Sequence, residues 1–355
     1  MVSSAVVERD GSALLSGPRG RYVCAQAAML VEGRLEVPYE AVGEDGTRVL
    51  LEQLRTLDAG SIEALIDPIA LLDPLGASVD AARYWQEPDP RDVLLEDSRI
   101  VAALEPIAHA LAAAPAARWW WSPVDLDEQA IVRWLWEKAT RADQPQLIGT
   151  AERLQQLRRE TQAEEADAAR ERATAFDANY SGSWWSTPLN ANVTTTSRRL
   201  GALPAVQLEL VEDAMGWERA RVAPVQVDRN RRVYEINTSA DWTDLVESYP
   251  LDVDRSRRHD WWRATGGTGP WQIPDWAAVG QAFDAVHLTV AGYLASAGRA
   301  LPTRGGYTVL AGFDPDLTYW LADSLTQAAP TATWQRIEHD EDGHEWIREP
   351  DHPLT

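Results

Sequence analysis

Residues able to bind anions and to transfer protons are concentrated in the segment 254–262, DRSRRHDWW. Arg257 and Arg258 carry guanidinium groups that can hold a phosphate or carboxylate through paired donors. A histidine titrates near neutral pH, so we take His259 as a candidate catalytic residue that Asp260 could orient. Trp261 and Trp262 could stack on a base or ring. The alternative is an exposed turn that one indole anchors.

A second candidate segment is 180–188, YSGSWWSTP, in which two indoles stand beside hydroxyl side chains. If this segment is a strand, Trp185 and Thr187 share one face while Trp184 and Ser186 share the other. One tryptophan could then be core while its neighbour faces a cleft. We therefore predict that Trp185, Ser186 and Thr187 bind a ligand, although the indoles could equally be core residues of a strand that polar residues end.

Charged residues follow this segment at positions that could complete a site. Arg198 lies at the exit of LNANVTTTSRR, and the alternating run AVQLELVED predicts a strand that directs Glu209 toward the cleft. Glu235 lies in a second short run, RRVYEI. The two glutamates are our candidates for stabilising positive charge on a reacting sugar.

A strand with Ser-Thr after an aromatic residue, arginines nearby and a glutamate on a later strand is similar to the layout of ADP-ribosyltransferase-like NAD-binding domains. The resemblance covers about residues 180–323, including IPDWAAVGQAFDAVHLT and VLAGFDPDLTYWL. It implies that the arginines and the Ser-Thr element seat NAD, and that Glu209 or Glu235 assists the departure of nicotinamide. The expected activity is then ADP-ribosyl transfer or NAD hydrolysis, with NAD as the cofactor.

Two other functions fit the same residues. An exposed Trp/Arg surface has the composition of a protein-interaction hot spot, and the acidic chain would favour a basic partner. Alternatively, His259 and Asp260 could serve an enzyme that acts on another small molecule. The sequence keeps all three possibilities open.

Composition excludes several classes of function. The net charge of −22 over 355 residues opposes binding to a nucleic acid backbone. No stretch approaches the length of an apolar membrane span and the start lacks a signal-peptide pattern, so we expect a cytoplasmic protein. Cys24 is the single cysteine and sits in an apolar helical pattern, which predicts burial. Lys138 is the only lysine, and an arginine- and alanine-rich composition is typical of a GC-rich bacterial genome.

No metal site is expected, because the histidines at the C-terminal end lack a compact ligand spacing. His339, His344 and His352 lie among many carboxylates, in a composition typical of a solvated terminus. His287 alternates with its neighbours in DAVHLTVAG, which favours a core or sheet-surface position.

The patterns together predict an α+β protein whose second half carries a mostly antiparallel sheet. We divide the chain into a helical domain (1–150), a charged linker helix (151–178), a tryptophan-rich mixed domain that binds the ligand (179–325) and an acidic tail (326–355). A helix is expected in SPVDLDEQAIVRWLWEKA, with further helices in SADWTDLVESY and IPDWAAVGQAF. Strands are expected in SWWSTP, AVQLELVED, ARVAPVQVD, RRVYEI, AVHLTVAGYL and YTVLAGF.

Overall fold

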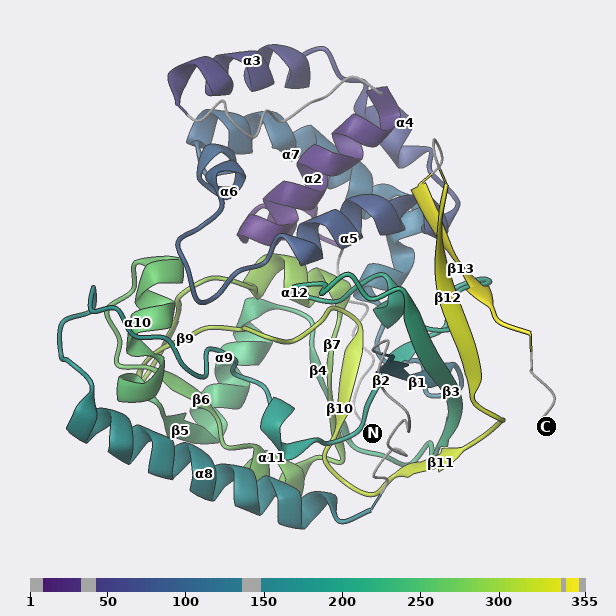
Figure 1. Ribbon diagram of the computed structural model, residues 1–355. Helices are drawn as coiled ribbons and strands as arrows, with labels where there is room; N and C mark the ends of the chain where they lie inside the picture. The colour runs from purple at the N-terminus through teal and green to yellow at the C-terminus, as the bar shows by residue number, and fades with distance from the viewer. Residues whose placement is uncertain (1–8, 33–42, 136–147, 340–342, 351–355) are drawn as a thin grey trace.

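The computed structural model describes residues 9–32, 43–135, 148–339 and 343–350, and it confirms the α+β fold with a mostly antiparallel mixed sheet. Figure 1 shows the N-terminal helices as a layer at the top of the molecule and α8 (Thr150–Glu171) along its lower edge. The sheet lies between them, and the hairpin of the last two strands stands at its side.

The N-terminal region consists of helices that stop and start at aspartates. Asp58, Asp67, Asp89 and Asp97 each accept a backbone amide in the first turn of the helix that follows, which satisfies a donor the helix leaves free. The helices are α1 (Gly11–Leu14), α2 (Pro18–Glu32), α3 (Glu44–Leu54), α4 (Ala59–Glu63), η1 (Pro68–Leu71), α5 (Leu72–Asp80), α6 (Pro90–Leu95), α7 (Ser98–Ala113) and η2 (Pro115–Trp121).

The central sheet has nine strands in the order β13-β12-β3-β1-β2-β10-β7-β4, with β11 pairing beside β12 on β3. Among the strands of this sheet in the described residues, only β4 and β7 pair in parallel. The strands are β1 (Gln129–Trp134), β2 (Thr195–Arg198), β3 (Arg219–Val227), β4 (Val233–Ile236), β7 (Ala285–Leu288), β10 (Leu317–Trp320), β11 (Leu325–Gln327), β12 (Ala332–His339) and β13 (Gly343–Arg348). Two small ribbons, β5 (Pro250–Asp252) with β6 (Gln272–Pro274) and β8 (Leu301–Thr303) with β9 (Gly306–Thr308), complete the strands.

The prediction of a helix after Ser122 is wrong over the described part of that segment. Residues 129–134 instead form β1, which pairs with β2 on one side and β3 on the other. Ala130, Ile131 and Val132 are all buried, so this short run has apolar neighbours on both faces of the sheet. Pairing with residues far along the chain overrides the local helix signal of its acidic start.

The range 326–355 was predicted to be an acidic tail, but its described residues include β12 and β13, which form a hairpin that extends the sheet from β3. The run ATWQRIEH includes Thr333, Trp334 and Ile337, which are residue types that favour strands. Trp346 of β13 is buried against Trp134 of β1. The hairpin therefore belongs to the fold.

Two further strand predictions fail. Residues 181–186 are irregular, since the Ser186 amide and hydroxyl both bond the Ala311 carbonyl instead of joining a ladder. Residues 206–208 form the short 3-10 helix η4 (Val206–Leu208), and Glu209 follows it. The runs ARVAPVQVD and RRVYEI are strands as predicted, whereas AVHLTVAGYL divides into β7 and the helix α12 (Val290–Ser296) and YTVLAGF is a strand only over β9.

The segment 254–262 is helical and is not an exposed turn. It forms most of α10 (Asp254–Thr265), whose first amides are capped by Glu165 of α8: the Arg255 and Ser256 amides donate to its carboxylate at 2.7 and 2.8 Å. The helices α9 (Ser239–Ser248) and α11 (Trp276–Ala282) form as predicted, with Thr238 and Asp275 as their N-caps. A last 3-10 turn, η3 (Leu189–Ala191), contacts α8.

The helical layer and the sheet share one hydrophobic core, which runs from Leu14 in α1 to Leu321 after β10. Helix α2 packs on α12, and Cys24 of α2 is fully buried within this core. The boundary drawn at residue 150 therefore does not separate two cores, and β1 from the first region is a central strand. Within the described ranges no single helix has the length and apolar character to cross a membrane, although α7 and η2 together pass that test as a bent pair.

Candidate functional site

The two glutamates predicted to be catalytic lie at different places, and each contacts a histidine. Glu209 contacts His344 of β13, and Glu235 contacts His287 of β7. The surroundings of the two pairs differ in charge and in access.

The Glu209 pair is aligned by an arginine. His344 donates from Nε2 to Glu209 Oε2 at 2.7 Å, and Arg336 of β12 donates from Nη2 to His344 Nδ1 at 3.1 Å. These two contacts orient the imidazole between the guanidinium and the carboxylate. The histidine and arginine come from neighbouring strands, where Arg336 pairs with Trp346 and Glu338 with His344.

This pair lines a cavity of about 230 Å³ that we call the tryptophan pocket. Trp134 of β1 stacks on Trp217 with ring centroids 4.8 Å apart, and Trp346 tilts against Trp134 at 5.9 Å. The pocket lies between α5, the loop 208–217 and the hairpin of β12 and β13. Its lining is Leu72, Asp73, Gly76, Ala77, Asp80, Trp134, Leu208, Glu209, Val211, Ala214, Gly216, Trp217, Arg336, His344 and Trp346.

The tryptophan pocket carries more negative than positive charge. Glu209, Asp73 and Asp80 supply carboxylates, against the guanidinium of Arg336. Burial raises the pKa of Glu209, while the hydrogen bond and charge of His344 act in the opposite direction. A raised pKa makes a carboxylate a stronger base toward a proton of a bound ligand.

The backbone conformation of residues 213–216 shapes the loop that follows Glu209. Gly216 adopts a φ of +67°, and a Cβ at that position would meet nothing within 4 Å. Asp213 also has a positive φ, and the Ala214 amide donates to Asp80 at 2.9 Å. The loop is therefore tied to α5 and leaves space in front of the indoles.

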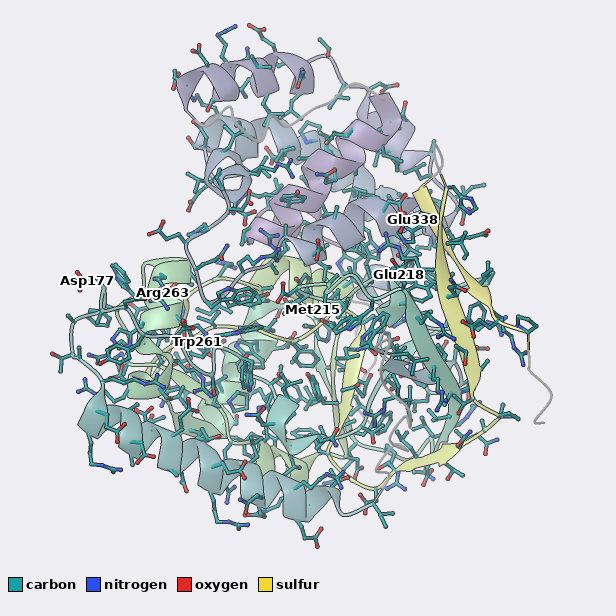
Figure 2. The ribbon with its side chains drawn as sticks, viewed as in Figure 1. Asp177, Met215, Glu218, Trp261, Arg263 and Glu338 are labelled. Carbon is teal, nitrogen blue, oxygen red and sulfur yellow. The ribbon has the colours of Figure 1, made fainter. Side chains whose placement is uncertain are left out.

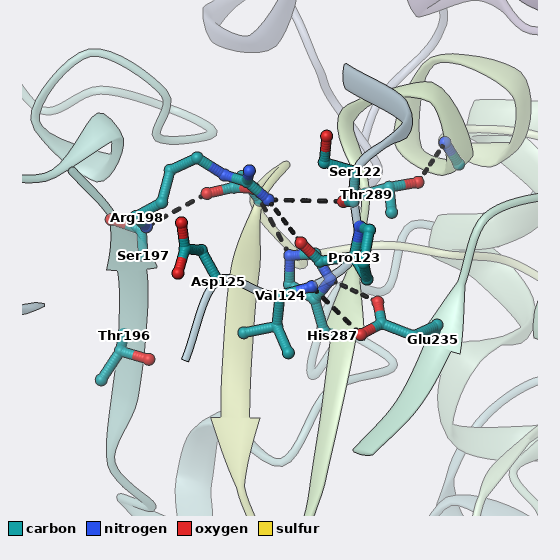
Figure 3. A network of polar contacts seen from close by, with 12 residues as sticks. Ser122, Pro123, Val124, Asp125, Thr196, Ser197, Arg198, Glu235, His287 and Thr289 are labelled. Carbon is teal, nitrogen blue, oxygen red and sulfur yellow. Dashed lines mark hydrogen bonds and ion pairs between the residues drawn. The ribbon is translucent and has the colours of Figure 1, made fainter. Parts of the chain in front are cut away.

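The Glu235 pair belongs to a closed ionic network (Figure 3). His287 contacts Glu235 Oε2 through Nδ1 at 2.6 Å and Asp316 Oδ1 through Nε2 at 3.4 Å. Arg198 donates from Nε to Asp316 Oδ1 at 2.6 Å and from Nη2 to the carbonyls of Ser122 and Pro123. The network, which we call the four-residue network, comprises Arg198, Asp316, His287 and Glu235.

The charges of the four-residue network balance when His287 is protonated. Burial lowers the pKa of His287, but the opposing effects of Glu235 and Asp316 together raise it to about 9. The side chains of His287 and Asp316 are each only 1% exposed. Glu235 also accepts the Val124 amide at 3.1 Å, so the loop after η2 closes over the network. The predicted residues Arg198 and Glu235 are thus brought together, but in a setting that joins strands.

Three of the predicted ligand-binding residues line a separate cavity of about 190 Å³ between α8 and α11. These are Trp185, Thr187 and Arg257. Arg257 is almost fully buried and donates to Glu164 of α8 at 2.9 Å. Its guanidinium therefore already has an anionic partner within the fold.

Of the remaining predicted residues, Ser186, Arg258 and Trp261 have partners within the fold. Ser186 is fully buried on the Ala311 backbone, and Arg258 binds Asp254 and stacks on Phe176. Trp261 has no exposed surface, and Figure 2 shows it inside the body, while Trp262 is half-buried. Trp261 therefore cannot contribute to an exposed Trp/Arg surface, whereas Trp262 and Arg258 are partly accessible.

His259 does not pair with Asp260 as predicted. Its Nε2 faces the Ala175 carbonyl at 3.1 Å, and burial lowers its pKa. The Asp260 carboxylate instead accepts from the Gly182 amide and from Arg263. Successive helical residues point in different directions, which explains why neighbours in sequence are separated here.

Sequence reasoning missed most of the tryptophan pocket. His344, Arg336 and Trp346 lie in the segment assigned to the tail, and Trp134 lies in the segment assigned to a helix. The available signal for the first three residues was the presence of strand-favouring types in both runs, Trp334 and Ile337 in one and Trp346 and Ile347 in the other. Asp316 carried no signal of its own, since it follows a turn aspartate in FDPD.

Comparison with known protein families, with curated proteins and with solved structures finds no match for this chain. In the described part of the chain, no group of three or more His, Cys, Asp or Glu side chains is placed to hold a metal ion. The functional argument accordingly rests on the geometry of the site.

Proposed function

We propose that this protein is an enzyme that binds a small, ring-bearing molecule in the tryptophan pocket and uses Glu209 for its chemistry. The observation that carries the proposal is the hydrogen bond between Glu209 and His344 at the wall of a cavity lined by three indoles. The side chains of Glu209 and His344 are 15% and 17% exposed, so both are sheltered and still reachable from the pocket.

The lining favours a flat or hydroxylated substrate. Indole faces pack on rings with a large buried area, and carboxylates accept hydrogen bonds from hydroxyl groups. A cavity of about 230 Å³ is slightly below the usual range of about 300 Å³ and above for ligand sites, so it suits one ring system of a substrate rather than a whole dinucleotide. The nicotinamide riboside end of NAD is such a unit.

The reaction that fits this arrangement is cleavage of a glycosidic bond. The electron pair of the bond leaves with the ring nitrogen, which releases nicotinamide as a neutral molecule. The Glu209 carboxylate stabilises the positive charge that develops on the sugar carbon. A water or another acceptor then forms the new bond to that carbon, and its proton passes to the Glu209–His344 pair.

The proposal is tested with the purified full chain and NAD. Chromatography follows nicotinamide release, and tryptophan fluorescence follows binding. The expected result is quenching by NAD together with release that falls at least about a hundredfold in Glu209→Gln, the scale of a lost general base.

A matched control is Glu345→Gln, which changes an exposed glutamate on the same strand next to His344. It should release nicotinamide at the rate of the unmodified protein. Equal rates in Glu209→Gln and Glu345→Gln would remove Glu209 from the chemistry, and the absence of both quenching and release would contradict the choice of NAD.

A protein-interaction role is the second candidate, supported by the edge of the sheet. Strand β13 is the last strand of the central sheet, and Ile347 on it is exposed. An extended segment of a partner could pair with such an edge, and the acidic chain favours a basic one. Fluorescence anisotropy of a labelled arginine-rich peptide tests this role, which predicts saturable binding that Ile347→Pro weakens.

A further inference from the structure

A third cavity, of about 330 Å³, lies where the start of α2 meets the loop after α5 and the end of α10. We call it the arginine pocket. Its lining is Ser16, Pro18, Arg19, Arg21, Ala82, Arg83, Tyr84, Pro88, Asp92, Glu96, Ala264, Thr265, Gly298, Arg299 and Ala300. It lies outside the tryptophan pocket and shares no lining residue with it.

The lining holds four arginines and only two carboxylates. Arg19 is buried and already satisfied, because it pairs with Asp92 and donates to the Ser78 carbonyl at 2.7 Å. Asp92 therefore offers little to the other guanidinium groups. The balance is an excess of positive charge, in a chain whose net charge is −22.

The other three arginines form no ion pair within 4 Å with any carboxylate in the described residues. Arg21 donates to the Leu15 carbonyl at 3.1 Å, Arg299 to the Ala295 carbonyl at 2.8 Å, and Arg83 to the carbonyls of Asp80 and Ala82. The Nε of Arg21 is buried without a hydrogen-bond partner. Each guanidinium has five N–H donors, so each keeps donors for a ligand.

Holding these guanidinium groups close together and partly buried costs free energy. Burial lowers the pKa of Arg299, and it also lowers that of Arg21, where the charges of Arg19 and Arg299 add to the effect while Glu96 and Asp92 oppose it. An anion in the pocket would offset this cost. Helix α2 begins at Pro18 on the pocket wall, and the positive end of its dipole adds to the attraction for an anion.

We propose that the arginine pocket binds the phosphate or pyrophosphate group of a small molecule. Guanidinium groups from α2, from the loop after α5 and from residue 299 surround the cavity, which suits the several acceptor oxygens of a phosphate. A phosphate also carries about two negative charges, which match the excess of four arginines over two carboxylates. The site is independent of the chemistry proposed for Glu209.

Isothermal titration of the full chain with inorganic pyrophosphate at low salt tests the proposal. The expected result is saturable binding of one anion per chain, with affinity that falls as salt is added. Arg299→Gln and Arg83→Gln should each raise the Kd about tenfold. The control Arg55→Gln changes an exposed arginine at the end of α3 and should leave the Kd unchanged.

Thermal melting confirms that each variant is folded, and Arg299→Lys, which keeps the charge, should recover part of the affinity if Arg299→Gln is unstable. Sodium acetate provides the comparison with a carboxylate and should bind more weakly than pyrophosphate. The proposal is overturned by no saturable heat up to millimolar pyrophosphate, by acetate binding as tightly, or by an equal loss in Arg55→Gln.

Discussion

Glu209–His344 and Glu235–His287 are two contacts of the same chemical type in one molecule, with the same residue types and closely similar distances of 2.7 and 2.6 Å. They differ in what surrounds them. His287 is almost fully enclosed and also faces Asp316, which pairs with Arg198. His344 contacts Arg336 through its other ring nitrogen and faces a cavity lined by indoles.

The difference indicates how a glutamate–histidine pair comes to serve either the fold or a ligand. In the four-residue network every charge has a partner, and the network connects β2, β4 and β7 with the residue before β10. Such a network loses stability when one member is removed. At the tryptophan pocket the pair keeps an accessible side, so its alteration should affect ligand chemistry more than folding.

The largest expected effect is on stability. Asp316→Asn removes the carboxylate between Arg198 and His287, so that the buried Arg198 loses its ion-pair partner and His287 keeps Glu235, which should cost about 3–5 kcal/mol in the free energy of unfolding. Urea unfolding at neutral pH, followed by circular dichroism, measures this loss. A loss below about 1 kcal/mol would show that the network does not hold the strands together.

The second effect is a fall in stability as the pH rises. His287 has a pKa of about 9 in the fold against 6.5 for a free histidine, so the folded state binds the proton more tightly. Its stabilisation is complete below about pH 6.5 and is lost as the pH rises through 9. Urea unfolding between pH 8 and 9.5 should show this decline in the unmodified protein and a flatter profile in His287→Gln.

A second buried group contributes to the pH dependence at lower pH. Burial, reinforced by the nearby Asp314, raises the pKa of Glu212 to about 8, and Tyr84 donates to its carboxylate. Because this acid is also more easily protonated in the fold than when free at 4.5, stability falls between pH 4.5 and 8. Glu212→Gln should reduce the decline most clearly between pH 4.5 and 6.5, below the range in which His287 contributes, and leave the range from pH 8 to 9.5 unchanged.

The smallest effect is expected for Glu209→Gln on stability. The amide keeps an acceptor oxygen for His344, and the buried carboxylate already carries a desolvation cost, so the free energy of unfolding should change by less than about 1 kcal/mol. The same urea titration measures it. A loss as large as that of Asp316→Asn would make the two glutamate–histidine pairs equivalent and remove the distinction between them.

Local patterns in the sequence predicted the elements that local contacts determine. α9 and α11 have capping residues beside them, and β3 and β4 alternate or are rich in β-branched residues. β1 was mistaken for a helix because its strand pairing comes from residues more than 60 positions away. Acidic residues at the start of a segment favour a helix less strongly than pairing in the centre of a sheet favours a strand.

The candidate site was predicted only in part, for a related reason. Glu209 was identified from its residue type, but its partner His344 lies 135 positions further along the chain. Glu235 was identified in the same way, and only the burial of His287 and Asp316 distinguishes its role from that of Glu209. Burial and long-range pairing depend on tertiary structure, so they cannot be predicted from the spacing of residues within one segment.

The most direct test of this account is the rate of nicotinamide release from NAD, measured per folded molecule in Glu209→Gln and in Glu235→Gln. The account predicts that release is lost in Glu209→Gln, which stays as stable as the unmodified protein. It predicts that Glu235→Gln retains release while its unfolding midpoint falls. Loss of release in Glu235→Gln with full activity in Glu209→Gln would contradict the assignment of the two pairs.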